Sequence, residues 1–191
     1  MEFEVYLQRY FGFAAQDLHA IAAHFAPLTL KKHSFYLREG EYAHRLGFLR
    51  SGMIREFLTD GEQEVTKWIA TPGYFVVDLA SFLFDRPARW NMQALADCEL
   101  LVLDREAYEQ IRRAVPGWAE AEKTFIARCF TVLEERVVHH LSLSAEQRYD
   151  ALFAMAPELF TQVPLQYLAS MLGMKPETLS RIRKKQSGST S

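Results

Sequence analysis

Short apolar segments cut by turn residues at fairly regular intervals run from about residue 29 to residue 104 of this 191-residue chain. The interruptions are Glu39-Gly40-Glu41, Ser51-Gly52, Asp60-Gly61 and Thr71-Pro72-Gly73. The segments between them are short enough for strands, and many short strands at such spacing are typical of a sandwich or barrel. This part of the chain therefore predicts a β domain.

Two local patterns add detail to this β domain. Asp60-Gly61 separates apolar segments at 55–58 and 65–69, which predicts a hairpin whose two turn positions both have positive φ. The segment from Asp78 to Phe84 is apolar without alternation and predicts a short helix. Strands are expected to resume near Asn91, and the run from Leu100 to Leu103 predicts a buried final strand.

Helical periodicity flanks the β domain on both sides. Apolar residues recur at helical spacing up to about Phe25, with Gly12 between two stretches and Pro27 closing the region. After Asp104 the pattern is helical again, and its longest candidate helix, Gly117–Leu141, needs a partner to cover its apolar stripe. Ser144 with Gln147 three residues on predicts a capping box at the start of the next helix.

Residues 161–184 predict two helices around a tight turn. Pro164 suits the first turn of one helix, Gly173 suits a left-handed cap at its end, and Pro176 opens the second helix. The inward-facing residues are expected to be Leu165, Leu168, Ala169, Leu172, Leu179 and Ile182. The second helix is then left with an outer face that is mostly charged.

Charge along the chain adds to this pattern. The formal net charge is −2, yet residues 174–191 hold five basic residues and a single acid, Glu177. A basic segment on an acidic protein is one sign of contact with nucleic acid. The alternative is an ordinary helical hairpin with a charged face. The combination of Ala169, Gly173 and a basic second helix favours DNA binding over this alternative.

At this point the chain resembles the catabolite-activator/Fnr family of transcription regulators over nearly its whole length. The resemblance is carried by Tyr36-Leu37-Arg38-Glu39-Gly40-Glu41, by residues 46–55, by Pro72-Gly73-Tyr74-Phe75 and by Pro176-Glu177-Thr178-Leu179-Ser180-Arg181. The last segment resembles the family's recognition helix, which usually reads Arg-Glu-Thr with an arginine three residues on. Pro176 replaces the first arginine, so one base contact of the best-known members is not expected here.

The resemblance implies an α+β fold: an N-terminal β-roll (a double-stranded β-helix, like cyclic-nucleotide-binding domains) with flanking helices, a long connecting helix and a C-terminal helix-turn-helix. The implied parts are a sensor domain at 1–115, a dimerisation helix at 116–142, a DNA-binding domain at 143–186 and a flexible tail at 187–191. It also implies a homodimer, a palindromic double-stranded operator with half-sites about 34 Å apart, and a contact with RNA polymerase. The expected DNA-binding residues are Lys175, Glu177, Thr178, Arg181, Arg183, Lys184 and Lys185, of which Glu177 and Arg181 would read bases.

The sensor pocket departs from the cyclic-nucleotide pattern. Val77 stands where glycine is expected, Asp78 stands where glutamate is expected, and the arginine position falls on Ala88. The candidate ligand-binding residues are Asp78, Leu79, Ala80, Arg86 and Arg89. Cyclic AMP remains one candidate effector, but the departures favour a different small ligand or no ligand. Asp78 could instead be a helix N-cap, and both arginines could be solvated loop charges.

Other classes of function find little support in the sequence. Cys98 and Cys129 are too few for an iron–sulfur cluster, and His139-His140 point in different directions on a helix and so form a poor metal pair. No HxH pair, GxSxG nucleophile motif or glycine-rich phosphate loop occurs. We therefore expect no enzyme, no metal site, no membrane segment and a cytoplasmic location. The alternative function is a cyclic-nucleotide-binding protein whose C-terminal helices act on a protein partner instead of DNA.

Overall fold

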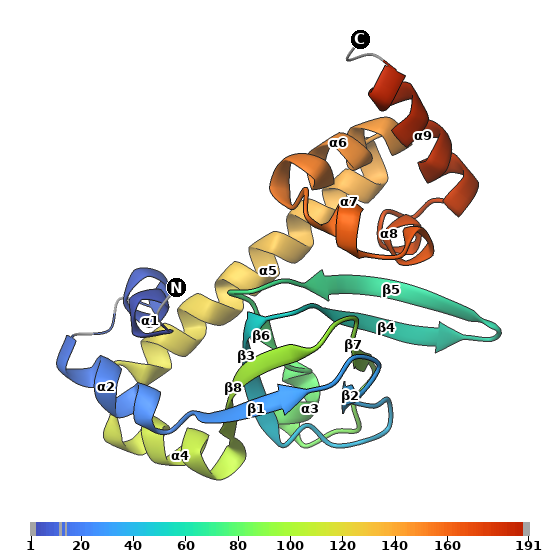
Figure 1. The fold of residues 1–191 in the computed structure, drawn as a ribbon. Coiled ribbons are helices and arrows are strands. Elements are labelled where there is room, and N and C mark those ends of the chain that lie inside the picture. The colour runs from blue at the N-terminus through green and yellow to red at the C-terminus, as the bar shows by residue number, and fades with distance from the viewer. Residues whose placement is uncertain (1–2, 12, 14, 189–191) are drawn as a thin grey trace. The chain divides into compact units, whose positions relative to one another are not determined.

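The computed structural model describes residues 3–11, 13 and 15–188 (Figure 1). The chain divides into two compact units. The first, here called the β unit, contains residues 1–56 and 70–131; the second, here called the helical unit, contains residues 57–69 and 132–191. The chain therefore passes between the units three times, after residues 56, 69 and 131.

Two four-stranded sheets form the β structure. The first has the order β1 (Ala26–Leu30), β8 (Cys98–Asp104), β3 (Arg45–Ser51), β6 (Phe75–Val76). The second has the order β2 (Phe35–Leu37), β7 (Asn91–Ala94), β4 (Ile54–Asp60), β5 (Gln63–Ala70). Pairing is antiparallel between β1 and β8, β3 and β8, β3 and β6, and β2 and β7. The predicted β domain is confirmed.

The core of the β unit lies between these sheets and against the helices beside them. Its most deeply buried side chains include Ile21, Leu49, Ile54, Leu100 and Leu103, each with 1% or less of its surface exposed. The strands that supply most of them are the apolar segments between turn signals. Burial of such side chains removes apolar surface from water and stabilises the fold by about 1.5–3 kcal/mol each.

Gly52 fixes the turn between β3 and β4. Its φ is +86°, and a Cβ at this position would lie 2.5 Å from the Asp97 carbonyl oxygen. Both the backbone conformation and the space therefore require glycine here.

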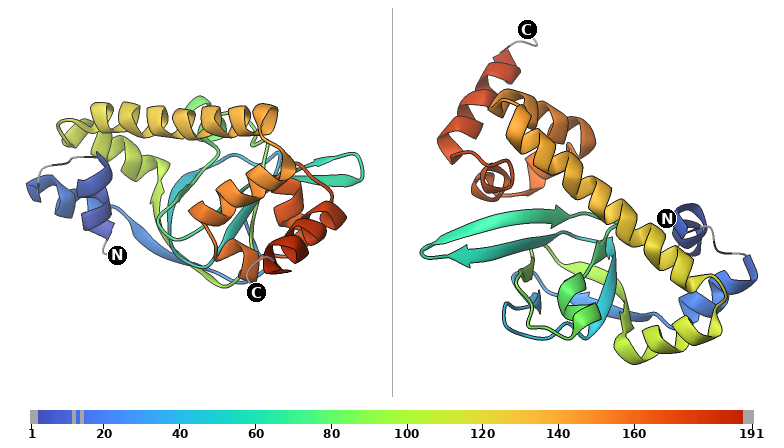
Figure 2. Two further views of the ribbon diagram at one scale, coloured as in Figure 1. Left: turned by 90° about the horizontal axis from the view of Figure 1, so that it is seen from above. Right: turned by 180° about the vertical axis from the view of Figure 1, so that it is seen from behind.

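Helices precede, interrupt and follow the strands. In the β unit α1 (Phe3–Phe11) and α2 (Ala15–Ala23) come first, α3 (Leu79–Phe84) lies between β6 and β7, and α4 (Arg105–Ala114) follows β8. The long helix α5 (Trp118–Ser142) is unbroken in Figure 2. The helical unit continues with α6 (Ala145–Met155), α7 (Leu159–Gln162), α8 (Leu165–Met171) and α9 (Pro176–Gly188). The expected short helix, long helix and Ser144–Gln147 capping box are all present.

Three details differ from the sequence-based expectation. The β4–β5 turn consists of Gly61 and Glu62, and Gly61 takes a positive φ (+60°) while Asp60 does not. With glycine first, the second position has no need of positive φ, so the expectation for Asp60 was wrong. Pro27 lies inside β1, where an edge strand tolerates its missing N–H. Helix α9 continues through residues 187 and 188 of the expected tail, and residues 189–191 lie outside the described residues.

Candidate functional site

The clearest candidate site is the helix pair α8 and α9 of the helical unit. Gly173 connects them with a φ of +64°, and the Met174 N–H donates to the Ala169 carbonyl at 2.9 Å, which closes the end of α8. The facing side chains Leu168 and Leu179 are fully buried, and Ile182 is 4% exposed. The helices, the turn and most of the inner faces expected from the sequence are therefore present, although Leu165 is only half-buried.

The outer face of α9 carries most of the expected DNA-binding residues. Lys175, Glu177, Arg181 and Lys184 are exposed, and Thr178 and Arg183 are half-buried. Lys185 is exposed as well, but its Nζ donates to the Glu146 carboxylate on α6 at 2.9 and 3.1 Å. The charge of Lys185 is therefore partly neutralised within the chain, whereas Lys175, Arg181 and Lys184 are exposed from just before α9 to its middle.

Arg148 holds the two-helix unit in place from α6. Its Nε donates to the Leu172 carbonyl at 2.9 Å, and its Nη1 donates to the Leu143 carbonyl at 2.8 Å. A guanidinium beside two helix ends satisfies carbonyls that have no partner within their own helices. The sequence analysis missed this residue because an arginine on a helix has no pattern that marks its acceptors.

The end of the β4–β5 hairpin belongs to the helical unit and contacts α8 and α5 there. The Thr66 N–H donates to Ser170 Oγ on α8 at 2.9 Å. Arg136 of α5 donates to the Lys67 carbonyl at 2.5 Å and lies over the Trp68 ring, 4.9 Å from its centroid. These contacts join residues that are 68 to 104 positions apart, so no local sequence pattern predicts them.

The second candidate site is the α3 segment of the β unit, where Asp78 is 5% exposed. One carboxylate oxygen accepts the Ser81 N–H at 3.1 Å and so caps α3. The other accepts the backbone N–H of Arg89 at 3.0 Å. Asp78 thus has the N-cap role that the sequence left open, and it contacts the Arg89 backbone.

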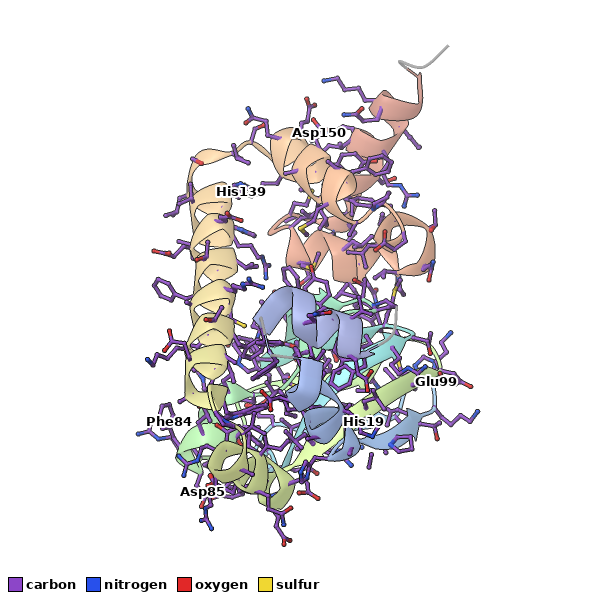
Figure 3. All side chains as sticks on the ribbon, turned by 90° about the vertical axis from the view of Figure 1, so that its left-hand side faces the viewer. His19, Phe84, Asp85, Glu99, His139 and Asp150 are labelled. Carbon is purple, nitrogen blue, oxygen red and sulfur yellow. The ribbon has the colours of Figure 1, made fainter. Side chains whose placement is uncertain are left out.

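The far end of α3 is fixed by Arg105 of α4. Its guanidinium donates to the Phe82 carbonyl at 2.8 Å and to the Asp85 carboxylate at 2.9 Å. Among the other expected ligand-binding residues, Leu79 is half-buried, while Ala80, Arg86 and Arg89 are exposed. The Arg86 guanidinium lies 6.0 Å from the Phe84 ring centroid, and Phe84 and Asp85 point outward in Figure 3.

Ala88, at the position where an arginine was expected, is 3% exposed. Its N–H donates to the Glu41 carbonyl at 2.7 Å, and its carbonyl accepts the Gly40 N–H at 2.8 Å. The backbone at this position is therefore held against the loop before β3. The Asp78 carboxylate binds backbone N–H groups, and the side chains of Arg86 and Arg89 do not join it in one charged cluster.

The long helix α5 carries an exposed apolar stripe. Ile126, Phe130, Leu133 and Val137 are 40%, 60%, 48% and 57% exposed and lie four, three and four residues apart. Spacing of this kind places them along one face of the helix. In the part of the chain that the structure describes, no group of three or more histidine, cysteine or acidic side chains could hold a metal ion. No described helix is long and apolar enough to cross a membrane.

A family of known proteins matches part of the β unit. Residues 27–114 match the family described as "Cyclic nucleotide-binding domain". This range begins in β1 and ends with α4, so it covers both sheets and α3. No curated protein sequence matches the chain.

Solved structures extend the likeness to nearly the whole chain. The catabolite activator protein of Thermus thermophilus is 24% identical, with 95% of this chain and 87% of that chain covered and a TM-score of 0.59. The fold is that of a catabolite activator protein. Two other solved structures share this catabolite-activator fold. The c-di-GMP-responsive global regulator CLP of Xanthomonas campestris is 16% identical, with 93% of each chain covered and a TM-score of 0.68. FixK2 of Bradyrhizobium japonicum is 15% identical, with 87% of this chain and 86% of that chain covered and a TM-score of 0.73. At such identities the likeness of this chain to these three proteins is one of fold.

Proposed function

We propose that the chain is a sequence-specific DNA-binding transcription regulator that acts as a dimer and carries an N-terminal domain for a small effector. The observation that carries this proposal is the division of α9 into two faces. Leu179 and Ile182 are buried within the helical unit, while Glu177, Arg181 and Lys184 remain exposed. A helix with this arrangement fits the major groove, which admits one α-helix.

Each exposed residue of α9 has a role in this proposal. Arg181 would donate to the O6 and N7 acceptors of guanine, and Glu177 would accept from the N4 amino group of cytosine. Lys175, Thr178, Arg183 and Lys184 would contact the phosphate backbone, which positions the protein without reading sequence. Lys185 would contribute less, because Glu146 already binds its ammonium group.

Dimerisation is proposed through α5. The stripe formed by Ile126, Phe130, Leu133 and Val137 has the spacing of a two-stranded coiled coil, and its exposed apolar surface would be covered by the same helix of a second chain. A two-fold dimer binds an operator of matching symmetry, with half-sites about 34 Å apart. The resemblance to bacterial regulators further supports a cytoplasmic location and a contact with RNA polymerase.

The effector of the β unit is proposed only as a class. The match to the cyclic nucleotide-binding domain family supports a cyclic nucleotide such as cyclic AMP, and the α3 segment is where it would bind. Asp78, Leu79, Ala80, Arg86 and Arg89 are its candidate contacts. The internal hydrogen bonds of Asp78 instead favour a different small ligand or none.

The proposal can be tested by selecting duplexes from a random library with the purified protein and measuring affinity for the selected site. Arg181→Ala should lower affinity for that site by about 1–3 kcal/mol and relax specificity at one base pair. Lys184→Ala is the matched control, because losing a phosphate contact should weaken binding to selected and random duplexes alike and reduce the salt dependence.

Two results would contradict the proposal in different ways. Equal losses on selected and random DNA for Arg181→Ala would remove its role in base reading. Failure of the library to yield any enriched sequence, with a well-folded protein, would favour the alternative in which the C-terminal helices contact a protein partner.

A further inference from the structure

A shallow groove lies along the outer face of α9 in the helical unit. Its walls come from the start of α8 and from successive turns of α9, and the lining residues are Leu165, Pro176, Glu177, Ser180, Arg181 and Lys184. Pro176, Ser180 and Lys184 follow one another at intervals of four residues, so they lie on one face of the helix. The groove therefore joins the proposed base-reading residues to an apolar pair, Leu165 and Pro176.

Pro176 forms the apolar end of this groove. It is the first residue of α9 and is exposed, while Leu165 is half-buried. The Lys175 carbonyl accepts the Leu179 N–H at 3.2 Å, and Leu179 is fully buried, so the first turn of α9 is fixed in place. A proline in the first turn removes no helical hydrogen bond. The exposed proline ring is therefore held rigidly at the end from which recognition helices contact base edges.

The chemistry of the apolar pair selects one group of the DNA. The side chains of proline and leucine have no hydrogen-bond donor or acceptor, so neither can pair with the polar edge of a base. Among the base edges of the major groove, the C5-methyl of thymine is the apolar group. Arg181 and Lys184 line the same groove, and their positive charges complement phosphates, which favours DNA over an apolar protein segment as the occupant.

We propose that Pro176, together with Leu165, contacts the C5-methyl group of one thymine in each half-site of the operator. This inference rests on the proposed function and adds one base to those read by Glu177 and Arg181. Contact with the proline ring removes the methyl group from water, so a base that lacks the methyl binds less tightly. Pro176 would thus read sequence through an apolar contact, in place of the hydrogen bonds that an arginine would form.

The test removes only the methyl group. Each thymine of the duplex selected by the purified full chain is replaced in turn by uracil, which keeps all hydrogen-bonding groups of thymine. We expect one replacement in a half-site to lower the affinity by about 3- to 5-fold, the effect of one buried methyl group. Pro176→Ala should lower the affinity for the thymine duplex by a similar factor and leave the affinity for that uracil duplex unchanged, because both changes remove the same contact.

Lys184→Ala is the matched control, because Lys184 lines the same groove. Loss of a phosphate contact should weaken binding to both duplexes alike and reduce the salt dependence, so the ratio of the two affinities stays the same. Pro176→Ser is a second variant that removes the ring, and serine is favoured near helix starts. It should abolish the difference between thymine and uracil as Pro176→Ala does.

Two results would overturn the inference and leave the proposed function intact. In the first, the protein binds a selected site, but no replacement of thymine by uracil changes its affinity. In the second, the uracil effect persists undiminished in folded Pro176→Ala and Pro176→Ser, so that another residue contacts the methyl group. A library without any enriched sequence would instead contradict the proposed function, and the inference would fail with it.

Discussion

Helix α3 and helix α9 use their polar side chains in opposite ways. At α3, Asp78 and Arg105 bind the helix ends and the backbone nearby, so their hydrogen bonds stabilise the chain itself. At α9, Glu177, Arg181 and Lys184 are exposed, while buried apolar residues and the hydrogen bonds of Lys185 and Gln186 to α6 hold the helix. The difference shows that a residue at a family's ligand position is evidence of binding only when its hydrogen bonds are still available.

The largest loss of stability is expected at α3, where Asp78 forms hydrogen bonds within the chain. Asp78→Ala removes an N-cap and leaves the buried N–H of Ser81 and the part-buried N–H of Arg89 without their carboxylate, which should cost about 2–4 kcal/mol of unfolding free energy. Urea denaturation followed by circular dichroism measures the loss.

Asp78→Asn is the control for that measurement. Asparagine keeps one side-chain oxygen for capping, so this variant should lose clearly less stability than Asp78→Ala. If both variants are as stable as the parent chain, Asp78 is not held by these hydrogen bonds and the contrast with α9 disappears.

A smaller loss of stability is expected for Arg136, a polar side chain that holds the helical unit together. Arg136→Ala removes a hydrogen bond to the Lys67 carbonyl and a contact with the Trp68 ring, which should cost about 1–2 kcal/mol. Amide hydrogen exchange should then increase at residues 64–68 and in α8. Arg113→Ala, at an exposed position of α4, serves as the control. Unchanged exchange in the hairpin would show that Arg136 does not fix it.

The smallest effect is expected when cyclic AMP is added to the protein. Because the Asp78 carboxylate is already bonded to two N–H groups, calorimetric titration of the full chain should give no saturable heat at micromolar nucleotide. Micromolar binding that is lost in Arg86→Ala or Arg89→Ala would reverse this expectation. The α3 segment would then be a nucleotide site despite its internal bonds, and the comparison with α9 would fail.

The features that sequence predicted well are those set by neighbouring residues. The cap at Gly173, the helix start at Pro176 and the inward faces of Leu179 and Ile182 all follow from local spacing and conformational preference. The α3 helix and its Asp78 cap are local in the same sense. The β-roll followed from the resemblance together with the repeated turn signals.

The features that sequence did not predict depend on residues far apart in the chain. Ser170 contacts Thr66 across 104 positions, and Arg105 contacts the end of α3 across 20 and 23 positions. Periodicity identifies which face of an element is buried, but it does not identify the partner that this face meets.

The chain crosses between its two units three times, and this limits which fragments keep the contacts of the helical unit. A fragment that begins at residue 132 would keep α9 but lose residues 57–69, and with them the partners of Arg136 and Ser170. Cleavage in the loop between α4 and α5 would still leave two strands connecting the units. The C-terminal helices therefore depend on residues 57–69 for part of their packing, and a fragment cut before α6 or within α5 would lose those contacts.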